Sequence, residues 1–208
     1  MIKESILNKL TPEIIEEMQH IWFTADLHHM HPIVDICNRP ISREDHDEWL
    51  IKEVFNKYVQ KNDHVYILGD VSLGKRKDAE KFIARLNGNK HLISGNHDKN
   101  VIHLGNFNEV KEIKDFTFSR NDLNIHIVLC HYPIASWNRK IHGSWHLYGH
   151  VHGRFENSGL SWDVGIDNRN ELGGVFGWCK PLNLYDICNI MAAKEEEQTP
   201  VLFLSSLR

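Results

Sequence analysis

Short hydrophobic runs alternate with longer amphipathic stretches through the first half of the chain. The runs at 21–25, 65–68 and 91–94 are rich in β-branched and aromatic side chains and have the length of buried strands. Between them, apolar residues recur every three or four positions, which places them on one face of a helix. This alternation predicts an α/β fold.

Three helices are expected from their start and stop signals. Thr11 and Pro12 have the residue types of a helix cap and a first helical position, and they predict a helix that reaches about residue 19. A second helix is expected to begin at Ser42. A third is expected to be capped by Asp78 and to end just before Gly88.

Strands dominate the second half of the chain. Further strands are expected over three ranges and can be extended by two more: 110–118, 125–130 and 146–148, then 162–166 and 201–204. The polar and then glycine-rich stretch 168–177 predicts a loop. The chain is therefore expected to fold as one domain over residues 1–208, with a mixed sheet or two packed sheets.

Composition narrows the class of protein. The 208 residues include 41% hydrophobic and 25% charged side chains, which is ordinary for a globular protein. A formal charge of -4 without a basic stripe argues against duplex nucleic acid as a partner. The four scattered cysteines are expected to be reduced thiols. With no apolar stretch of about 18 residues and no signal-peptide core, the expected location is the cytoplasm, away from membranes.

Polar side chains that can bind a metal follow the apolar runs in five short clusters. The seven candidate ligands are Asp26, His28, Asp70, Asn96, His131, His150 and His152. Each cluster taken singly is as well explained by a turn, a cap or a hydrogen-bonded histidine. All five come just after expected strands, where open α/β sheets bind their ligands, and this shared placement predicts one common site.

The donor set of two carboxylates, one amide oxygen and four imidazoles suits two neighbouring divalent metals. Asp26 and His28 are two positions apart, so in an extended strand both point to one face and can reach one ion. His150 and His152 have the same spacing and can straddle the site, one for each metal. Such a mixture favours Mn, Fe, Zn or Ni over Ca, and a closed zinc site would favour paired cysteines.

The ordered motifs Asp-x-His, Gly-Asp, Gly-Asn-His-Asp, His and Gly-His-x-His resemble those of the calcineurin-like metallophosphoesterases over about residues 21–186. The resemblance is strongest to a branch of small bacterial and phage phosphoesterases, which share the Asn-Arg-Pro segment at 38–40 and the Lys-Pro-Leu-Asn-Leu stretch at 180–184. It implies two mixed sheets packed face to face with helices outside. It also implies a first metal on Asp26, His28 and His152, a second on Asn96, His131 and His150, and Asp70 as a bridge.

The activity implied is hydrolysis of a phosphate ester by in-line attack of a hydroxide that bridges two divalent ions, with Mn²⁺ expected first and Fe, Zn, Ni or Mg as alternatives. His97 is the candidate general acid, and Asp98 is expected to orient and charge its ring. His31 and Arg39 are candidate substrate contacts. The substrate is expected to be small and nucleotide-like, and monoesters, diesters and cyclic diesters all remain open.

Three alternatives accompany this prediction. The branch usually has Phe-Gly-His after the first histidine, whereas this chain continues through His29-Met30-His31, so that His29 competes with His28 as a ligand. The pair His46-Asp47 could belong to a helical His-Asp phosphohydrolase, which the expected strands disfavour. A catalytically inactive scaffold of the same fold, used for protein binding, predicts missing ligands, and all seven are present.

Overall fold

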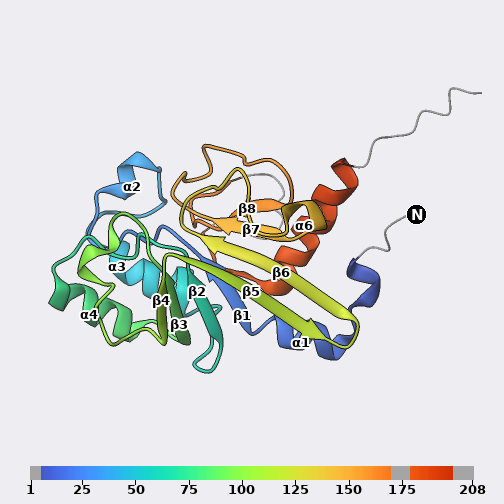
Figure 1. Ribbon diagram of the computed structural model, residues 1–208. Coiled ribbons are helices and arrows are strands. Elements are labelled where there is room, and N and C mark those ends of the chain that lie inside the picture. Colours follow the sequence, from blue (N-terminus) through green and yellow to red (C-terminus); the bar gives the residue numbers. More distant parts are fainter. Residues whose placement is uncertain (1–5, 170–178, 199–208) are drawn as a thin grey trace, which may run out of the picture.

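Two mixed sheets make up the centre of the molecule, with helices flanking them (Figure 1). The computed structural model describes residues 6–169 and 179–198. Within these residues the strand orders are β4-β3-β2-β1-β9 in a five-stranded sheet and β5-β6-β7-β8 in a four-stranded sheet. The predicted α/β class with two packed mixed sheets is therefore confirmed.

The five-stranded sheet is built on parallel strands from the first half of the chain. Its strands are β1 (Ile21–Thr24), β2 (His64–Ile67), β3 (Asn89–Ile93), β4 (Glu109–Lys111) and the antiparallel β9 (Leu182–Asn183). Side chains alternate between its faces, so Trp22 lies in one hydrophobic core and Phe23 in another.

Helices cover the face to which Trp22 points. This core includes α3 (His46–Trp49), its π-helical continuation η2 (Leu50–Phe55) and α4 (Arg76–Arg85). Asp78 lies within the first turn of α4, and Lys75 occupies the cap position without a side-chain hydrogen bond, so the predicted capping by Asp78 is wrong. The periodic stretches from the sequence correspond to these helices.

The second sheet packs against the opposite face, where Phe23 lies. Its strands are β5 (Ile113–Arg120), β6 (Leu123–Cys130), β7 (Trp145–Tyr148) and β8 (Ser161–Asp163). β5 and β6 form an antiparallel hairpin, and β7 and β8 extend it in parallel. The same core receives side chains from α1 (Pro12–Met18) and from α6 (Leu184–Gln198).

The strand expected over 110–118 is in fact two strands in different sheets. β4 pairs with β3, whereas β5 pairs with β6, and Glu112 alone separates them. A hydrophobicity pattern reports that a segment is extended but does not identify its hydrogen-bonding partner, which explains the error. The pattern also missed α2 (Ile33–Ile36) and α6.

Two predictions fall on other parts of the chain. The strand expected over 201–204, and the loop expected over 168–177 from residue 170 onward, lie outside the described residues.

Among the helices that the structure describes, none combines the length and apolar character required to cross a membrane.

Candidate metal centre

The five predicted clusters all follow strands, and the fold brings their side chains together. The loops after β1, β2 and β3 leave the same edge of the first sheet because these strands are parallel. The loops after β6 and β7 supply the remaining histidines. Two groups of predicted ligands result that can hold a metal ion, with the ligand atoms of each group within 4.8 Å of one another. A third group that meets the same distance criterion, Cys37, His152 and Asp167, shares His152 with the first.

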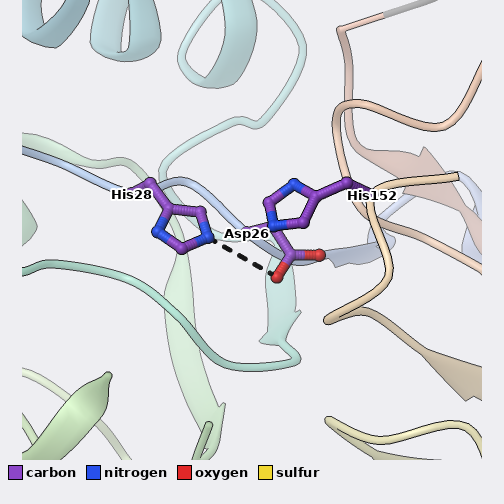
Figure 2. A group of neighbouring side chains, drawn as sticks. All are labelled: Asp26, His28 and His152. Atoms are coloured by element: carbon purple, nitrogen blue, oxygen red, sulfur yellow. Dashed lines mark ion pairs between the residues drawn. The ribbon is translucent and has the colours of Figure 1, made fainter. Parts of the chain in front are cut away.

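The first group consists of Asp26, His28 and His152. Figure 2 shows these three side chains gathered together, with a dashed line from His28 to the Asp26 carboxylate; His28 Nε2 lies 3.9 Å from Asp26 Oδ1. The ring centroids of His28 and His152 lie 5.0 Å apart. Asp26 and His28 are buried, so this group lies deep in the fold.

The second group consists of Asp70, His131 and His150. His131 Nε2 lies 3.5 Å from Oδ1 of Asp70, whereas His28 Nε2 of the first group lies 3.6 Å from Oδ2. Asp70 therefore presents one carboxylate oxygen to each group. His150 and His152 fall into different groups, as their spacing predicted.

The environment of His131 fits a cation between its ring and Asn96. His131 Nδ1 lies 2.8 Å from the buried carbonyl of Leu68, to which a neutral ring donates its single N–H. The Nε2 lone pair then faces Asn96 Oδ1 at 3.1 Å. With Nε2 unprotonated, both atoms present lone pairs, and a cation bound by both would offset their repulsion.

His28 gives a second indication that the donor set fits a metal. Both of its ring nitrogens are buried without a hydrogen-bond partner. Burial, followed by the nearby His152, lowers the pKa of His28 to about 2, so the imidazole is neutral and available as a ligand. Buried polar atoms are normally paired, so an unpaired ring facing two carboxylates is well explained by a bound cation.

The buried carboxylates around Asp26 also indicate that a cation binds at the first group of ligands. Burial raises the pKa of Asp26 well above its usual range, and the neighbouring carboxylates of Asp163, Asp70 and Asp167 raise it further. Of these four buried acids, Asp167 is paired with Arg39. A cation near Asp26 would offset the remaining like-charge repulsion.

Glycines allow the chain to pass close to Asp26. A Cβ atom on Gly149 would lie 2.7 Å from Asp26 Oδ2, and one on Gly165 would lie 2.6 Å from the same oxygen. Gly165 also forms a β-bridge with Ala25, which joins the end of β1 to the segment after β8. Any larger side chain at either position would displace the carboxylate.

Most of the candidate ligands have unusual backbone conformations. Five of the seven have left-handed φ values: Asp26 (60°), His28 (54°), Asp70 (55°), His150 (72°) and His152 (51°). Such angles are uncommon for residues other than glycine and concentrate at functional sites. β1 ends at Thr24, so Asp26 and His28 meet through these turns, and the extended spacing assumed from the sequence does not apply.

Asp167 orients His152 and was missed by the sequence analysis. His152 Nδ1 donates to Asp167 Oδ2 at 2.8 Å, which leaves Nε2 to face Asp26 and His28. The hydrogen bonds from His152 and Arg39 hold the pKa of Asp167 well below its usual range despite burial. The signal was present in the sequence, since Asp167 follows an apolar run as the other clusters do.

Arg39 is buried and does not take the predicted substrate-contacting position. Its Nε and Nη2 donate to the two oxygens of Asp167 at 2.9 and 2.7 Å. Nη2 also donates to the carbonyl of Asp26, and Nη1 donates to the carbonyl of Leu27 and to His46 Nε2. All five guanidinium donors are thus used within the protein, and Arg39 acts as a positioning residue.

Asp98 also differs from its predicted role. Its carboxylate is buried and accepts hydrogen bonds from the backbone N–H groups of Asp70, Val71 and Gly95 at 2.9, 2.9 and 2.7 Å. It therefore joins the loops after β2 and β3 and does not orient the ring of His97. His97 itself lies at the rim of the site with its side chain 40% exposed, and its Nε2 is 4.0 Å from Asp70 Oδ2.

The two other histidines of the loop after β1, His29 and His31, have different surroundings. His31 lies beside the site, with ring centroids 5.0 Å from His28 and 6.0 Å from His97. His29 instead stacks on Phe82 and lies 2.7 Å from Ser72 Oγ. The structure therefore removes His29 as a competitor of His28.

The competing His46-Asp47 pair also has structural contacts. His46 is buried against Arg39, and Asp47 accepts a hydrogen bond from the backbone N–H of Met30. These contacts join α3 to the loop after β1. The two residues belong to neither of the two groups of ligands.

Comparisons with known proteins place the chain among relatives whose names state no activity. No protein-family model matches the sequence. The chain is 35% identical to the uncharacterized protein MJ1445 of Methanocaldococcus jannaschii over 139 residues, which cover 65% of this chain and 70% of that protein. The chain therefore belongs to the family of that archaeal protein.

Phage proteins and one solved structure are also similar. The Gene 66 protein of Mycobacterium phage D29 is 28% identical over 184 residues, covering 74% of this chain and 92% of that protein. The Gene 66 protein of Mycobacterium phage L5 is 42% identical over 85 residues, which cover 39% and 41% of the two chains. The crystal structure of the protein of unknown function AQ665 from Aquifex aeolicus matches with a TM-score of 0.58 and 19% identity, covering 82% and 98% of the two chains, and this likeness concerns the fold alone.

Proposed function

We propose that this chain is a dinuclear metal-dependent phosphoesterase of the calcineurin-like class. The observation that carries the proposal is the position of Asp70, whose two oxygens lie 3.6 and 3.5 Å from imidazole nitrogens of two different ligand groups. A carboxylate shared in this way suits a pair of adjacent divalent ions. Imidazole together with carboxylate and amide oxygen favours Mn²⁺, with Fe, Zn, Ni or Mg as alternatives.

The residues divide between two positions in this proposal. Asp26, His28 and His152 would hold one ion, and Asn96, His131 and His150 the other, with Asp70 between them. Divalent ions at these positions supply positive charge that attracts a phosphate ester and lowers the pKa of water at the site. The hydrogen bonds from His131 to Leu68 and from His152 to Asp167 support this division, because both direct an Nε2 lone pair into the site.

His97 is the proton donor of the proposed reaction. It lies at the exposed rim, near Asp70 and His31, where a leaving group can reach its ring. Its backbone N–H donates to Asp70 Oδ1, which ties the residue to the bridging carboxylate. A protonated His97 can pass its proton to the departing alkoxide oxygen.

The experiment combines metal content with turnover. The purified chain is incubated with Mn²⁺, assayed by elemental analysis, and tested on nitrophenyl phosphate, bis-nitrophenyl phosphate and a 2′,3′-cyclic nucleotide. We expect Asp70→Asn to lose both metal and activity, and His97→Ala to keep metal but lose turnover.

The control is Asp122→Asn, which makes the same chemical change at an exposed position in the turn between β5 and β6. Full activity of Asp70→Asn would contradict the dinuclear proposal. Metal binding without turnover of any ester would favour the inactive scaffold instead.

A further inference from the structure

A cavity of about 490 Å³ opens directly beside the first group of ligands. His152 lines this cavity and also belongs to the first metal-binding group, so its side chain is shared by the two sites. Its other lining residues include Ile36, Arg154 and Phe155. This volume falls in the range of small-molecule sites and suits one nucleoside, whereas a folded polymer would need a longer groove.

Two apolar side chains at the cavity remain open to solvent. Ile36 and Phe155 are each 52% exposed, although they come from segments far apart in the sequence. A single exposed apolar residue needs no explanation, but a pair that lines one cavity next to a candidate catalytic centre favours binding of an apolar surface. The flat ring of Phe155 is suited to stacking against an aromatic ligand.

Arg154 adds positive charge to the same cavity. One of its Nη groups donates to the carbonyl of Ile36 at 2.9 Å, and no carboxylate among the described residues pairs with it. The nearby acids are already paired, Glu156 with Lys194 at 2.8 Å and Asp167 with Arg39 at 2.7 Å. The guanidinium of Arg154 is therefore available to hydrogen-bond acceptors of a ligand in the cavity.

We infer that this cavity binds the organic part of the substrate, and that the substrate is a nucleotide with its base against Phe155 and its acceptor groups within reach of Arg154. The inference rests on the proposed function, because the phosphate group would lie at the metal centre beside His152. Stacking on an aromatic side chain and contacts from arginine are recurrent features of the recognition of unpaired bases by proteins. An aryl phosphate such as phosphotyrosine also has a flat aromatic ring, so the test must distinguish a nucleotide from an aryl phosphate.

The test compares three esters on the metal-loaded full chain: AMP, phosphotyrosine and methyl phosphate. We expect Phe155→Ala to lower kcat/KM for AMP by roughly 5- to 100-fold, the effect of losing one base-stacking contact, mainly through KM. Arg154→Gln is expected to act in the same direction. In both variants the ratio of kcat/KM for AMP to that for methyl phosphate should fall.

Control variants make comparable substitutions outside the cavity. Ile141→Ala removes an apolar side chain that is 91% exposed, and Arg76→Gln removes an exposed arginine that also donates to a backbone carbonyl, that of His103. Neither should change the ratio. An unchanged ratio in both Phe155→Ala and Arg154→Gln overturns the inference, and a loss confined to phosphotyrosine overturns the choice of a nucleotide.

Adenosine separates this inference from the proposed function. It has no phosphate ester, so its binding can be measured by calorimetry whether or not the chain hydrolyses anything. Binding that Phe155→Ala abolishes supports the cavity even if every ester resists hydrolysis. Turnover of AMP that is insensitive to Phe155 and Arg154 overturns the nucleotide cavity and leaves the phosphoesterase proposal intact.

Discussion

Side chains hold the first group of ligands in place, whereas the backbone holds much of the second. In the first group, Asp167 accepts a hydrogen bond from His152 and orients its ring, and Arg39 donates both to Asp167 and to the carbonyl of Asp26. In the second group, the ring of His131 bonds to a backbone carbonyl, and Asp98 fixes the loops through three backbone amides.

Burial separates the two groups at one residue only. Asp26 and His28 of the first group and Asp70 and His131 of the second are buried, whereas His150 of the second group is exposed, and so are the neighbouring Asn96 and His97. The stability of the first group, which a charged network holds, should therefore be sensitive to single substitutions at some distance from the ligands. The stability of the second group, which lies on turns between strands, should depend less on any one neighbouring side chain.

The largest expected effect is that of Arg39→Met. It removes all five donors and leaves the buried Asp167 carboxylate without its cation, which should lower the free energy of unfolding by about 3–5 kcal/mol. Urea denaturation measures this loss. Arg43→Met removes an exposed arginine paired with Asp35 and should change little. Equal losses in the two variants would show that the Arg39 network does not stabilise the first group.

Lowering the pH should decrease the free energy of unfolding through His46, which contacts Arg39 next to the first group of ligands. Burial, followed by the charge of Arg39, lowers the pKa of His46 to about 4, below its ordinary value of 6.5. The unfolded chain therefore binds more protons between these pH values, and the free energy of unfolding falls as the pH decreases from 6.5 to 4. The loss is up to about 3 kcal/mol.

Denaturation curves of wild type and His46→Gln across this pH interval isolate that contribution. The substitution removes the titrating ring, so the difference in unfolding free energy between the two proteins should change with pH. A constant difference between pH 6.5 and 4 would mean that His46 does not become protonated on unfolding.

Asp98→Asn should have a smaller effect, in the region that holds the second group. The amide keeps one acceptor oxygen and places an NH₂ group against the remaining backbone N–H, which should cost about 2 kcal/mol of unfolding free energy. Chemical denaturation measures it, and the exposed Asp122→Asn should stay within about 0.5 kcal/mol of wild type. A larger loss than that of Arg39→Met would reverse the comparison between the two regions.

The smallest expected effect is on metal affinity in Asp167→Asn. The ligands themselves remain, but His152 loses the charged acceptor that orients its ring, and affinity should fall about tenfold. Calorimetric titration with Mn²⁺ measures this change. Asp186→Asn, which replaces an acid at the start of α6, provides the control for affinity. Unaltered affinity in Asp167→Asn would limit Asp167 to a role in stability.

Much of the fold could be predicted from local pattern. The parallel strands β1 to β3 and the helix α1 with its Thr11 cap appear in the sequence as apolar runs and capping signals. The assignment of neighbouring segments to different sheets could not be predicted in this way. At Glu112 the chain changes partner from β3 to β6, and no local feature marks which strand an extended segment will pair with.

The sequence by itself determined which side chains are offered to the site and that they follow strands. It placed Asp26, Asp70 and His131 after apolar runs, and the fold brings them together. Only the tertiary structure decided how these residues are held. The hydrogen bonds of Arg39 reach Asp167 across 128 positions, and the left-handed turns at Asp26 and Asp70 arise where strands end at a crowded sheet edge. Local pattern reports burial and periodicity, whereas the partner of a buried charge depends on segments that meet only after folding.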